Sequence, residues 1–226
     1  MISFHSITKI YLSDVIALEN ISFNISQKEF VSIVGRSGSG KTTLLKLLLR
    51  EERPTEGSIF FEGENLLEAG NKSLSEIRRR IGVVFQDYKL LDDKTAYENI
   101  AYAMEITGKS PEEINSEVPE ILEIIELTDR ANNFPKELSE GECQRISIAR
   151  AIAHRPDVIL ADEPTGNLDP YCSQDIVRLL LKIYELGTTI VLATHDKNIV
   201  NKLKKRVITL ENGKIIRDQE KGKFVL

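Results

Sequence analysis

Short runs of apolar residues recur along the chain, and longer stretches with a polar and an apolar face separate them. Such runs are typical of strands that are buried on both faces of a parallel sheet. The pattern predicts strands at residues 30–34, 81–85, 158–161 and 189–193, and a helix at residues 173–186. Because strands alternate with helices, we expect a parallel sheet with right-handed crossovers, and hence an α/β fold.

Two parts of the chain depart from this pattern. Residues 1–25 alternate between apolar and polar positions, which predicts half-buried antiparallel strands. Residues from about 88 to 155 are mainly amphipathic and are predicted to be helical. We therefore expect residues 1–226 to form a single domain. An N-terminal antiparallel β subdomain and an inserted α-helical subdomain, approximately residues 88–155, would accompany its α/β core.

Two local signals predict where helices begin. Ser73 and Glu76 have the spacing of a capping box, which predicts a short helix that runs through Arg80. Ser110 is followed by Pro111 and two acidic residues, the pattern of an N-cap and the first turn of a helix.

Composition narrows the possible partners. The chain has 226 residues, with 30 Lys and Arg against 35 Asp and Glu, a net charge of −5. Nucleic-acid-binding surfaces are basic, so no nucleic-acid partner is expected. Cys143 and Cys172 lack the spacing of a zinc site, which predicts no zinc and a reducing compartment. No apolar run approaches the roughly 20 residues of a membrane span, and residues 1–5 lack a signal-peptide pattern. We expect a cytoplasmic protein that reaches a membrane only by docking to another molecule.

The candidate chemistry begins at residues 35–43, which fit the phosphate-loop pattern G-x-x-x-x-G-K-[ST]. Glycines permit a tight turn whose N–H groups point at phosphate oxygens, and the following helix adds its positive dipole end. Lys41 is long enough to reach the β- and γ-phosphates, and the Thr42 hydroxyl is a ligand for Mg²⁺. The loop therefore predicts a nucleoside triphosphate bound with Mg²⁺. Its predicted binding residues are Gly35, Arg36, Ser37, Gly38, Ser39, Gly40, Lys41, Thr42 and Thr43.

The predicted core strands also end on polar residues. The apolar run at residues 158–161 leads directly into Asp162 and Glu163. Ligands of parallel sheets bind beyond the carboxyl ends of the strands. Asp162 is a candidate to help hold Mg²⁺, and Glu163 is a candidate to orient and deprotonate an attacking water. An acidic helix cap is the alternative for this pair. Gln86 is a candidate for the metal or the water, and His195 for the γ-phosphate.

The segment Leu138-Ser139-Glu140-Gly141-Glu142-Cys143-Gln144-Arg145 resembles the signature sequence of ATP-binding cassette (ABC) ATPases. Other elements occur in the order that the family shows. Tyr11 matches the adenine-stacking position and Gln86 the Q-loop. Asp162 matches the Walker B aspartate and Glu163 the catalytic glutamate, while residues 166–169 match the D-loop and His195 the switch histidine. The resemblance spans nearly the whole chain. It implies a P-loop NTPase fold with a RecA-like core, ATP as the nucleotide, and Thr42, Gln86 and Asp162 around Mg²⁺.

The resemblance also implies an assembly. It implies a homodimer with ATP sandwiched between subunits, in which each subunit completes its partner's site with Ser139, Gly141 and Asp169. The implied activity is ATP hydrolysis coupled to an integral membrane protein that docks in a groove near residues 88–91. The implied location is cytoplasmic, peripheral on the inner face of the cell membrane.

Within the family, three stretches at residues 83–91, 95–100 and 133–135 resemble a branch that acts in cell division and regulates cell-wall hydrolases. Residues 161–169 are shared with ATPases of lipoprotein-releasing and macrolide exporters, which stay an alternative. A soluble cassette of translation or DNA repair would need a second cassette or a long insertion. The interval from Gln86 to Ser139 leaves no room for one, since 139 − 86 = 53 residues.

Glu140 departs from the family pattern, which has glycine at this position, and Cys143 replaces a glutamine. By analogy the signature lies against the γ-phosphate bound to the opposite subunit, where a carboxylate would repel the phosphate and weaken closure. A nucleotide-gated scaffold with little turnover is therefore a further alternative.

Overall fold

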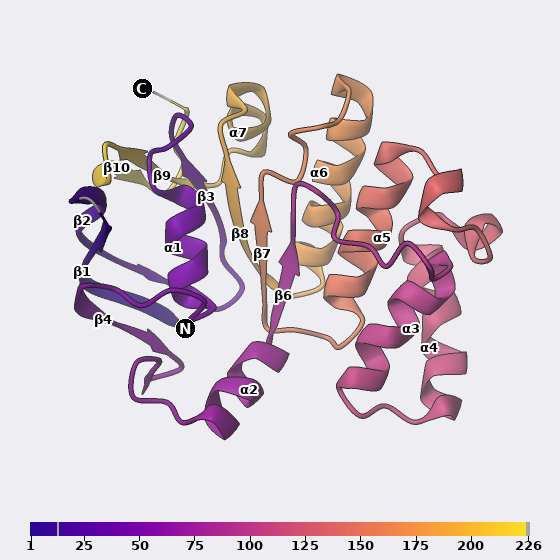
Figure 1. Ribbon diagram of the computed structural model, residues 1–226. Helices are drawn as coiled ribbons and strands as arrows, with labels where there is room; N and C mark the ends of the chain where they lie inside the picture. The colour runs from indigo at the N-terminus through magenta and orange to yellow at the C-terminus, as the bar shows by residue number, and fades with distance from the viewer. Residues whose placement is uncertain (13, 225–226) are drawn as a thin grey trace. The chain divides into compact units, whose positions relative to one another are not determined.

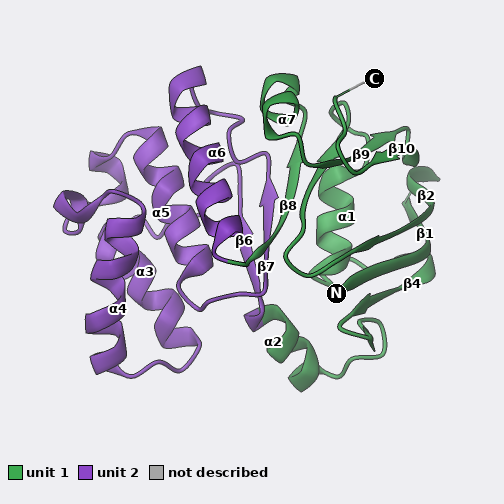
Figure 2. Ribbon diagram, turned by 180° about the vertical axis from the view of Figure 1, so that it is seen from behind, with its two compact units in different colours: residues 1–78, 187–226 green, residues 79–186 purple. Residues whose placement is uncertain are grey.

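A computed structural model describes residues 1–12 and 14–224. Contacts divide the chain into two compact units, which we call unit 1 (residues 1–78 with 187–226) and unit 2 (residues 79–186) (Figure 2). Unit 2 contains strands as well as helices, so it is larger than the helical insertion predicted at residues 88–155. The single-domain organisation stays a prediction.

Unit 1 contains an antiparallel sheet with the strand order β2-β1-β4-β5 (Figure 1). Its strands are β1 (Ile2–Tyr11), β2 (Val15–Ile25), β4 (Glu56–Phe61) and β5 (Glu64–Asn65). Alternate residues of β1 and β2 are buried, and Phe4 stacks on Phe23 with the ring centroids 4.6 Å apart. β1 pairs with β2 in the antiparallel direction, which confirms the antiparallel strands predicted at residues 1–25. Their alternating burial arises because side chains of one face pack together while those of the other face solvent.

Unit 1 also contains the strand that leads into the phosphate loop. β3 (Phe30–Val34) pairs in parallel with β8 (Thr189–Thr194) and with β9 (Arg206–Glu211), and β10 (Lys214–Gln219) is antiparallel to β9. Every residue of β3 and β8 is buried, which explains why their sequences are mainly apolar. The helices of this part are α1 (Lys41–Leu48), α2 (Asn71–Arg79) and α7 (Lys197–Leu203).

The predicted start of α2 is wrong. The helix begins at Asn71, so Ser73 lies inside its first turn and is not its N-cap. The Ser73 hydroxyl donates to the carboxylate of Glu64 on β5, an acceptor that the local sequence pattern does not reveal.

Unit 2 pairs β6 (Ile81–Val84) in parallel with β7 (Val158–Asp162), which confirms both predicted strands. Its helices are α3 (Ala96–Ile106), α4 (Pro111–Ile124), α5 (Glu140–Ile152) and α6 (Pro170–Glu185). Helix α5 contacts α3, α6 and β6, so it is the helix around which this unit is packed. Parallel strands, an N-terminal antiparallel sheet and a helical part confirm the predicted fold class.

Side-chain caps set the starts of these helices. Thr95, Ser110 and Ser139 are N-caps, each with a capping-box glutamate at the third helical position, and the prediction for Ser110 is confirmed. Helix α6 begins at Pro170, earlier than predicted, because the Asp169 carboxylate accepts two backbone N–H groups of its first turn.

Among the described residues, no helix combines the length and the apolar character that crossing a membrane requires.

Candidate functional site

The phosphate loop of unit 1 holds its lysine against its own backbone. The Lys41 Nζ atom donates to the Gly35 carbonyl at 2.9 Å and to the Arg36 carbonyl at 3.3 Å. Lys41 is only 6% exposed, so its charge lies beneath the loop and not in bulk water. A buried ammonium group needs such acceptors, and these bonds fix the lysine in place before any ligand arrives.

The loop is also shaped by glycines and ends without a side-chain cap. Gly40 has φ of 104° and is the N-cap of α1, where no side chain bonds to the first turn. A side chain at Gly35 would place Cβ 2.3 Å from the Ser39 Oγ atom and 2.4 Å from the Leu210 carbonyl oxygen. The buried Ser39 hydroxyl has no hydrogen-bond partner among the described residues. A buried polar atom beside an uncapped helix start fits a phosphate oxygen as its missing partner.

His195 follows the strand that neighbours the loop. Val34 is paired with Thr194 in the parallel register, so Gly35 and His195 both emerge from the same edge of the sheet. The His195 residue is exposed, while Asp196 behind it caps α7 through the backbone N–H groups of Asn198 and Ile199. The loop and His195 therefore lie at one strand edge of unit 1, as predicted, and the contact with phosphate stays a prediction.

Tyr11 lies at the end of β1, paired with Val15 across the hairpin. Its ring is half-exposed, and the Lys9 Nζ atom lies 4.8 Å from the ring centroid. Lys9 in turn pairs with Glu52 at 2.8 Å. One cation thus approaches the ring, and the predicted stacking on adenine stays a prediction.

In unit 2, Gln86 and the two predicted carboxylates share one strand edge. Val84 is paired with Ala161, so Asp162, the last residue of β7, and Gln86, two residues beyond β6, lie at the same ends of neighbouring parallel strands. Glu163 has φ of 47°, a left-handed backbone that costs about 1–2 kcal/mol in a residue other than glycine. Its carbonyl accepts the N–H of Gly166 at 3.0 Å, which closes a tight turn. Strain of this kind concentrates at functional positions, and it falls here on the predicted general base.

Asn167 holds the Gln86 side chain through a reciprocal pair of hydrogen bonds. The Gln86 Nε2 atom donates to the Asn167 Oδ1 atom at 3.1 Å, and the Asn167 Nδ2 atom donates back to the Gln86 carbonyl at 3.2 Å. Residues 166–169 match the D-loop of the family, but no role was predicted for Asn167. The two partners are 81 residues apart, so no local pattern indicates the contact.

Three residues predicted to bind nucleotide hold the starts or the contacts of helices in this chain. Ser139 and Glu142 form the capping box of α5, and the N–H of Ser139 at 2.8 Å lowers the pKa of the Glu142 carboxyl. Asp169 caps α6, and hydrogen bonds from the Cys172 thiol and then the backbone lower its pKa. A Cβ atom at Gly141 would lie 3.1 Å from the Cys172 sulfur, so glycine allows α5 and α6 to approach closely.

Glu140, the departure from the family pattern, is the first residue of α5 and is exposed. A carboxylate at this position is favourable for the helix dipole. In the isolated chain, Glu140 therefore makes the first turn of α5 more stable than glycine would.

A half-buried arginine, Arg150, had no role among the residues predicted from the sequence. The Arg150 guanidinium donates to the Lys89 carbonyl at 2.6 Å and to the Tyr88 carbonyl at 3.2 Å. Both of these residues have left-handed backbones, with φ of 52° at Lys89 and 57° at Tyr88. Burial lowers the pKa of the guanidinium. Nearby, the Gln144 side chain donates to the Phe85 carbonyl at 3.3 Å, so α5 holds the segment around Gln86 from two positions.

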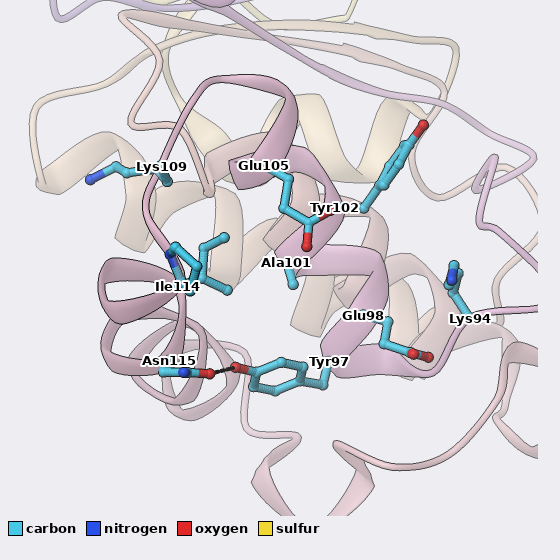
Figure 3. A pocket seen from close by; sticks show the side chains of 10 residues that line it. Lys94, Tyr97, Glu98, Ala101, Tyr102, Glu105, Lys109, Ile114 and Asn115 are labelled. Atoms are coloured by element: carbon cyan, nitrogen blue, oxygen red, sulfur yellow. Dashed lines mark hydrogen bonds between the residues drawn. The ribbon is translucent and has the colours of Figure 1, made fainter.

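Unit 2 also has a cavity of about 630 Å³ between α3 and α4 (Figure 3). At one end the Tyr97 hydroxyl donates to the Asn115 Oδ1 atom at 2.9 Å. None of the site residues predicted from the sequence lines this cavity.

The predicted metal ligands all offer oxygen, the donor that Mg²⁺ prefers. Thr42 presents an exposed hydroxyl in unit 1, and unit 2 has the amide of Gln86 and the half-buried carboxylate of Asp162. The chemistry of this donor set fits Mg²⁺.

A buried strand, a glycine-shaped loop, an uncapped helix and a loop-bound lysine together define a P-loop nucleotide-binding protein. The family model for ABC transporters matches residues 18–166, more than half of the chain. The chain belongs to the ABC transporter family, as the sequence analysis predicted.

Curated relatives cover nearly the whole chain. The cell division ATP-binding protein FtsE of Bacillus subtilis is 48% identical over 224 residues, covering 99% of this chain and 98% of the relative. FtsE of Mycobacterium tuberculosis is 46% identical, with 99% and 98% covered, and FtsE of Escherichia coli K12 is 43% identical, with 94% and 96% covered. The predicted resemblance to this branch is confirmed.

Solved structures of a related cassette have the same fold. A dimeric structure of a post-hydrolysis state of the ATP-binding cassette MJ0796, bound to ADP and Pi, is 37% identical with a TM-score of 0.88, covering 99% of this chain and all of the other. A second dimeric structure of MJ0796, described as a bacterial ABC transporter cassette, is 38% identical with a TM-score of 0.89. The P-loop fold that the sequence analysis predicted is therefore confirmed.

Proposed function

We propose that this protein binds Mg·ATP and hydrolyses it, as the FtsE-type ATPase of a membrane complex in cell division. The observation that carries the proposal is the phosphate loop, where Lys41 is fixed beneath the backbone and the buried Ser39 hydroxyl has no hydrogen-bond partner within the part of the chain that the structure describes. The names of the relatives support the cell-division role, and the post-hydrolysis structure of the related cassette supports turnover.

The proposed reaction transfers the γ-phosphoryl group of ATP to water. Glu163 orients the water and takes its proton while the water oxygen bonds to the γ-phosphorus and the bond to ADP breaks. Lys41 binds the β- and γ-phosphates, and His195 contacts the γ-phosphate. Mg²⁺, held by Thr42, Gln86 and Asp162, supplies neutralisation of the phosphate charge when it is bound.

The proposed active form is a homodimer with ATP between the subunits. The partner's signature, through Ser139 and Gly141, and its D-loop, through Asp169, complete each site, while Tyr11 stacks on adenine. Dimeric structures of the related cassette support this arrangement. In this chain Ser139 and Asp169 already have fixed positions as helix caps, so the proposed contacts need little reordering.

The proposed membrane partner is an FtsX-like integral membrane protein that docks near residues 88–91. Opening and closing of the dimer would then pass force through the membrane to cell-wall hydrolases, with this protein peripheral on the inner face of the membrane. The FtsE relatives support the choice of partner.

Glu163→Gln tests the catalytic core of the proposal. The amide keeps the size of the side chain but cannot accept the proton of the attacking water. We expect ATP binding to survive, ATP-dependent dimers to accumulate on size exclusion, and phosphate release to fall by a factor of about 100–10,000, the usual contribution of a positioned general base.

Glu185→Gln is the matched control, because Glu185 is an exposed carboxylate at the end of α6. It should leave ATP binding and phosphate release unchanged. Undiminished phosphate release in the Glu163→Gln variant would remove Glu163 from the role of base.

Glu140 favours one second candidate, a nucleotide-gated scaffold. If its exposed carboxylate faces the γ-phosphate of the opposite subunit, repulsion slows closure without preventing binding. Wild-type protein that binds Mg·ATP and dimerises but releases no phosphate would establish the scaffold in place of the ATPase.

A further inference from the structure

We propose that Asn167 is a positioning residue that determines which end of the Gln86 amide is left for the reacting site. The proposal rests on the proposed function for what that amide does, but its geometry lies entirely within unit 2. Gln86 and Asn167 form two hydrogen bonds with each other, at 3.1 and 3.2 Å, although they are far apart in the chain.

The polarity of the two bonds follows from the backbone. A carbonyl oxygen can only accept, so the group of Asn167 that meets the Gln86 carbonyl must be its NH₂. The Asn167 Oδ1 atom then faces the other way and can only accept. It takes the Nε2 group of Gln86, because the other end of that amide has no proton to give. The Gln86 Oε1 atom is the end that remains.

The turn after Glu163 packs closely against the Gln86 amide. A Cβ atom at Gly166 would lie 2.8 Å from the Gln86 Nε2 atom and 3.0 Å from Cδ. The Gly166 N–H closes the turn on the Glu163 carbonyl at 3.0 Å. The turn that sets the backbone of Glu163 is therefore the same turn that packs against the Gln86 amide.

The Gln86 Oε1 atom, which Asn167 leaves without a bond, is the end of the amide that the proposed reaction requires. An amide oxygen can ligate Mg²⁺ or accept a proton of the attacking water, whereas an NH₂ group repels a cation. Groups that orient a metal ligand in this way typically change metal affinity by about 10–100-fold when they are removed. Asn167 acts only through Gln86, so it is a positioning residue and not a catalytic one.

Four variants test this: Asn167→Ala, Gln86→Ala, the double variant, and Gly166→Ala. Asn167→Ala should raise the Mg²⁺ concentration for half-maximal ATP binding about 10-fold or more. In the Gln86→Ala background the same change should add less than about 2-fold, because the residue through which it acts is gone. Gly166→Ala should repeat the Asn167→Ala effect with little loss of stability, since it displaces only the end of a flexible side chain.

A second readout needs no ligand. The side-chain NH₂ signals of Gln86 in a ¹⁵N–¹H spectrum, assigned by their loss in Gln86→Ala, should shift in Asn167→Ala and in Gly166→Ala. Asn132→Ala, at an exposed position outside this network, should leave both the signals and the Mg²⁺ dependence unchanged.

Two results would overturn the proposal: unmoved Gln86 signals in Asn167→Ala, or full additivity of the two substitutions in the Mg²⁺ dependence of ATP binding. Wild-type protein that binds no Mg·ATP would instead refute the proposed function, and the ligand-free spectra would still decide the role of Asn167.

Discussion

Unit 1 and unit 2 hold their predicted site residues by different physical means. In unit 1 the backbone makes the site: Gly40 supplies a left-handed turn, no side chain caps α1, and the loop's own carbonyls hold Lys41. In unit 2 side chains make it, since Asn167 holds Gln86 and Arg150 holds the turn that follows it.

The difference decides how each half responds to substitution. A site formed by main-chain atoms cannot adjust to an added side chain, because the Cβ atom meets main-chain atoms that cannot move without disturbing the sheet. A side-chain site is a set of separate hydrogen bonds, so each loss is graded and couples to its immediate partners. Glycine substitutions in unit 1 should therefore have their largest effect where the added Cβ atom meets other atoms, as at Gly40, whereas substitutions in unit 2 should have graded effects.

The largest effect is expected from Gly40→Ala. A Cβ atom there would lie 2.6 Å from both the Ala17 carbonyl oxygen and the Leu18 Cδ2 atom, and φ of 104° strains any side chain. Strain and overpacking together should cost about 3–4 kcal/mol. We expect a thermal midpoint lower by roughly 6–16 °C and a loss of ATP binding, measured by thermal unfolding and by nucleotide titration.

Gly38→Ala is the matched control. Gly38 also has a positive φ, of 79°, but a Cβ atom there meets nothing within 4 Å. Only the conformational strain of about 1–2 kcal/mol should remain. Equal losses in the two variants would show that strain alone matters and that the close contact at Gly40 does not.

The middle effect is expected from Arg150→Met in unit 2. The substitution removes two charge-assisted hydrogen bonds and leaves the carbonyls of Tyr88 and Lys89 without donors. We expect a destabilisation of about 2–3 kcal/mol in urea unfolding and faster amide exchange at residues 88–91. The stability of Arg150→Lys should lie between those of the wild type and Arg150→Met, because an ammonium group lacks the planar fork that reaches both carbonyls.

Arg155→Met is the control, because Arg155 is a largely exposed arginine of the same unit. Its loss should cost less than about 1 kcal/mol. An Arg150→Met variant that is as stable as this control, with unchanged exchange at residues 88–91, would show that the turn holds its left-handed conformation without Arg150.

The same contrast explains what the sequence could predict. The phosphate loop is local, so glycine, lysine and threonine at fixed spacing identified residues 35–43 before any fold was known. The buried strands and the cap at Ser110 were predictable for the same reason, since periodicity and capping act over a few residues. The pairing of loop and His195 at one strand edge followed from the parallel sheet alone.

The network around Gln86 had no such signal. Asn167 and Arg150 reach their partners across 81 and 61 or 62 residues, through helices whose packing the pattern does not specify. The error at Ser73 has the same origin, because Glu64, a residue outside the helix, takes its hydroxyl. Local chemistry was predictable, whereas hydrogen bonds created by tertiary packing were not.

The smallest effect is expected from Ser139→Ala. This variant tests whether the stability of a helix start in unit 2 depends on a titratable side chain. The cap should contribute about 1 kcal/mol near neutral pH. Hydrogen bonds from the N–H and then the hydroxyl of Ser139 hold the pKa of Glu142 below its ordinary value of 4.5. A lowered carboxyl pKa gives stability that is present above the unfolded pKa and is lost as pH falls through the folded one.

The gap in unfolding free energy between wild type and Ser139→Ala should therefore narrow as pH is lowered from about 6 to about 3, as measured by urea unfolding at each pH. In a Glu142→Gln background the gap should no longer change with pH, since the titrating group is absent. A gap that stays constant in the wild-type background would mean that the capping box of α5 is held without the charge of Glu142. The Ser139 hydroxyl would still accept the backbone N–H of Glu142, whereas no side chain caps α1, so the contrast between the two units would hold at this position without depending on pH.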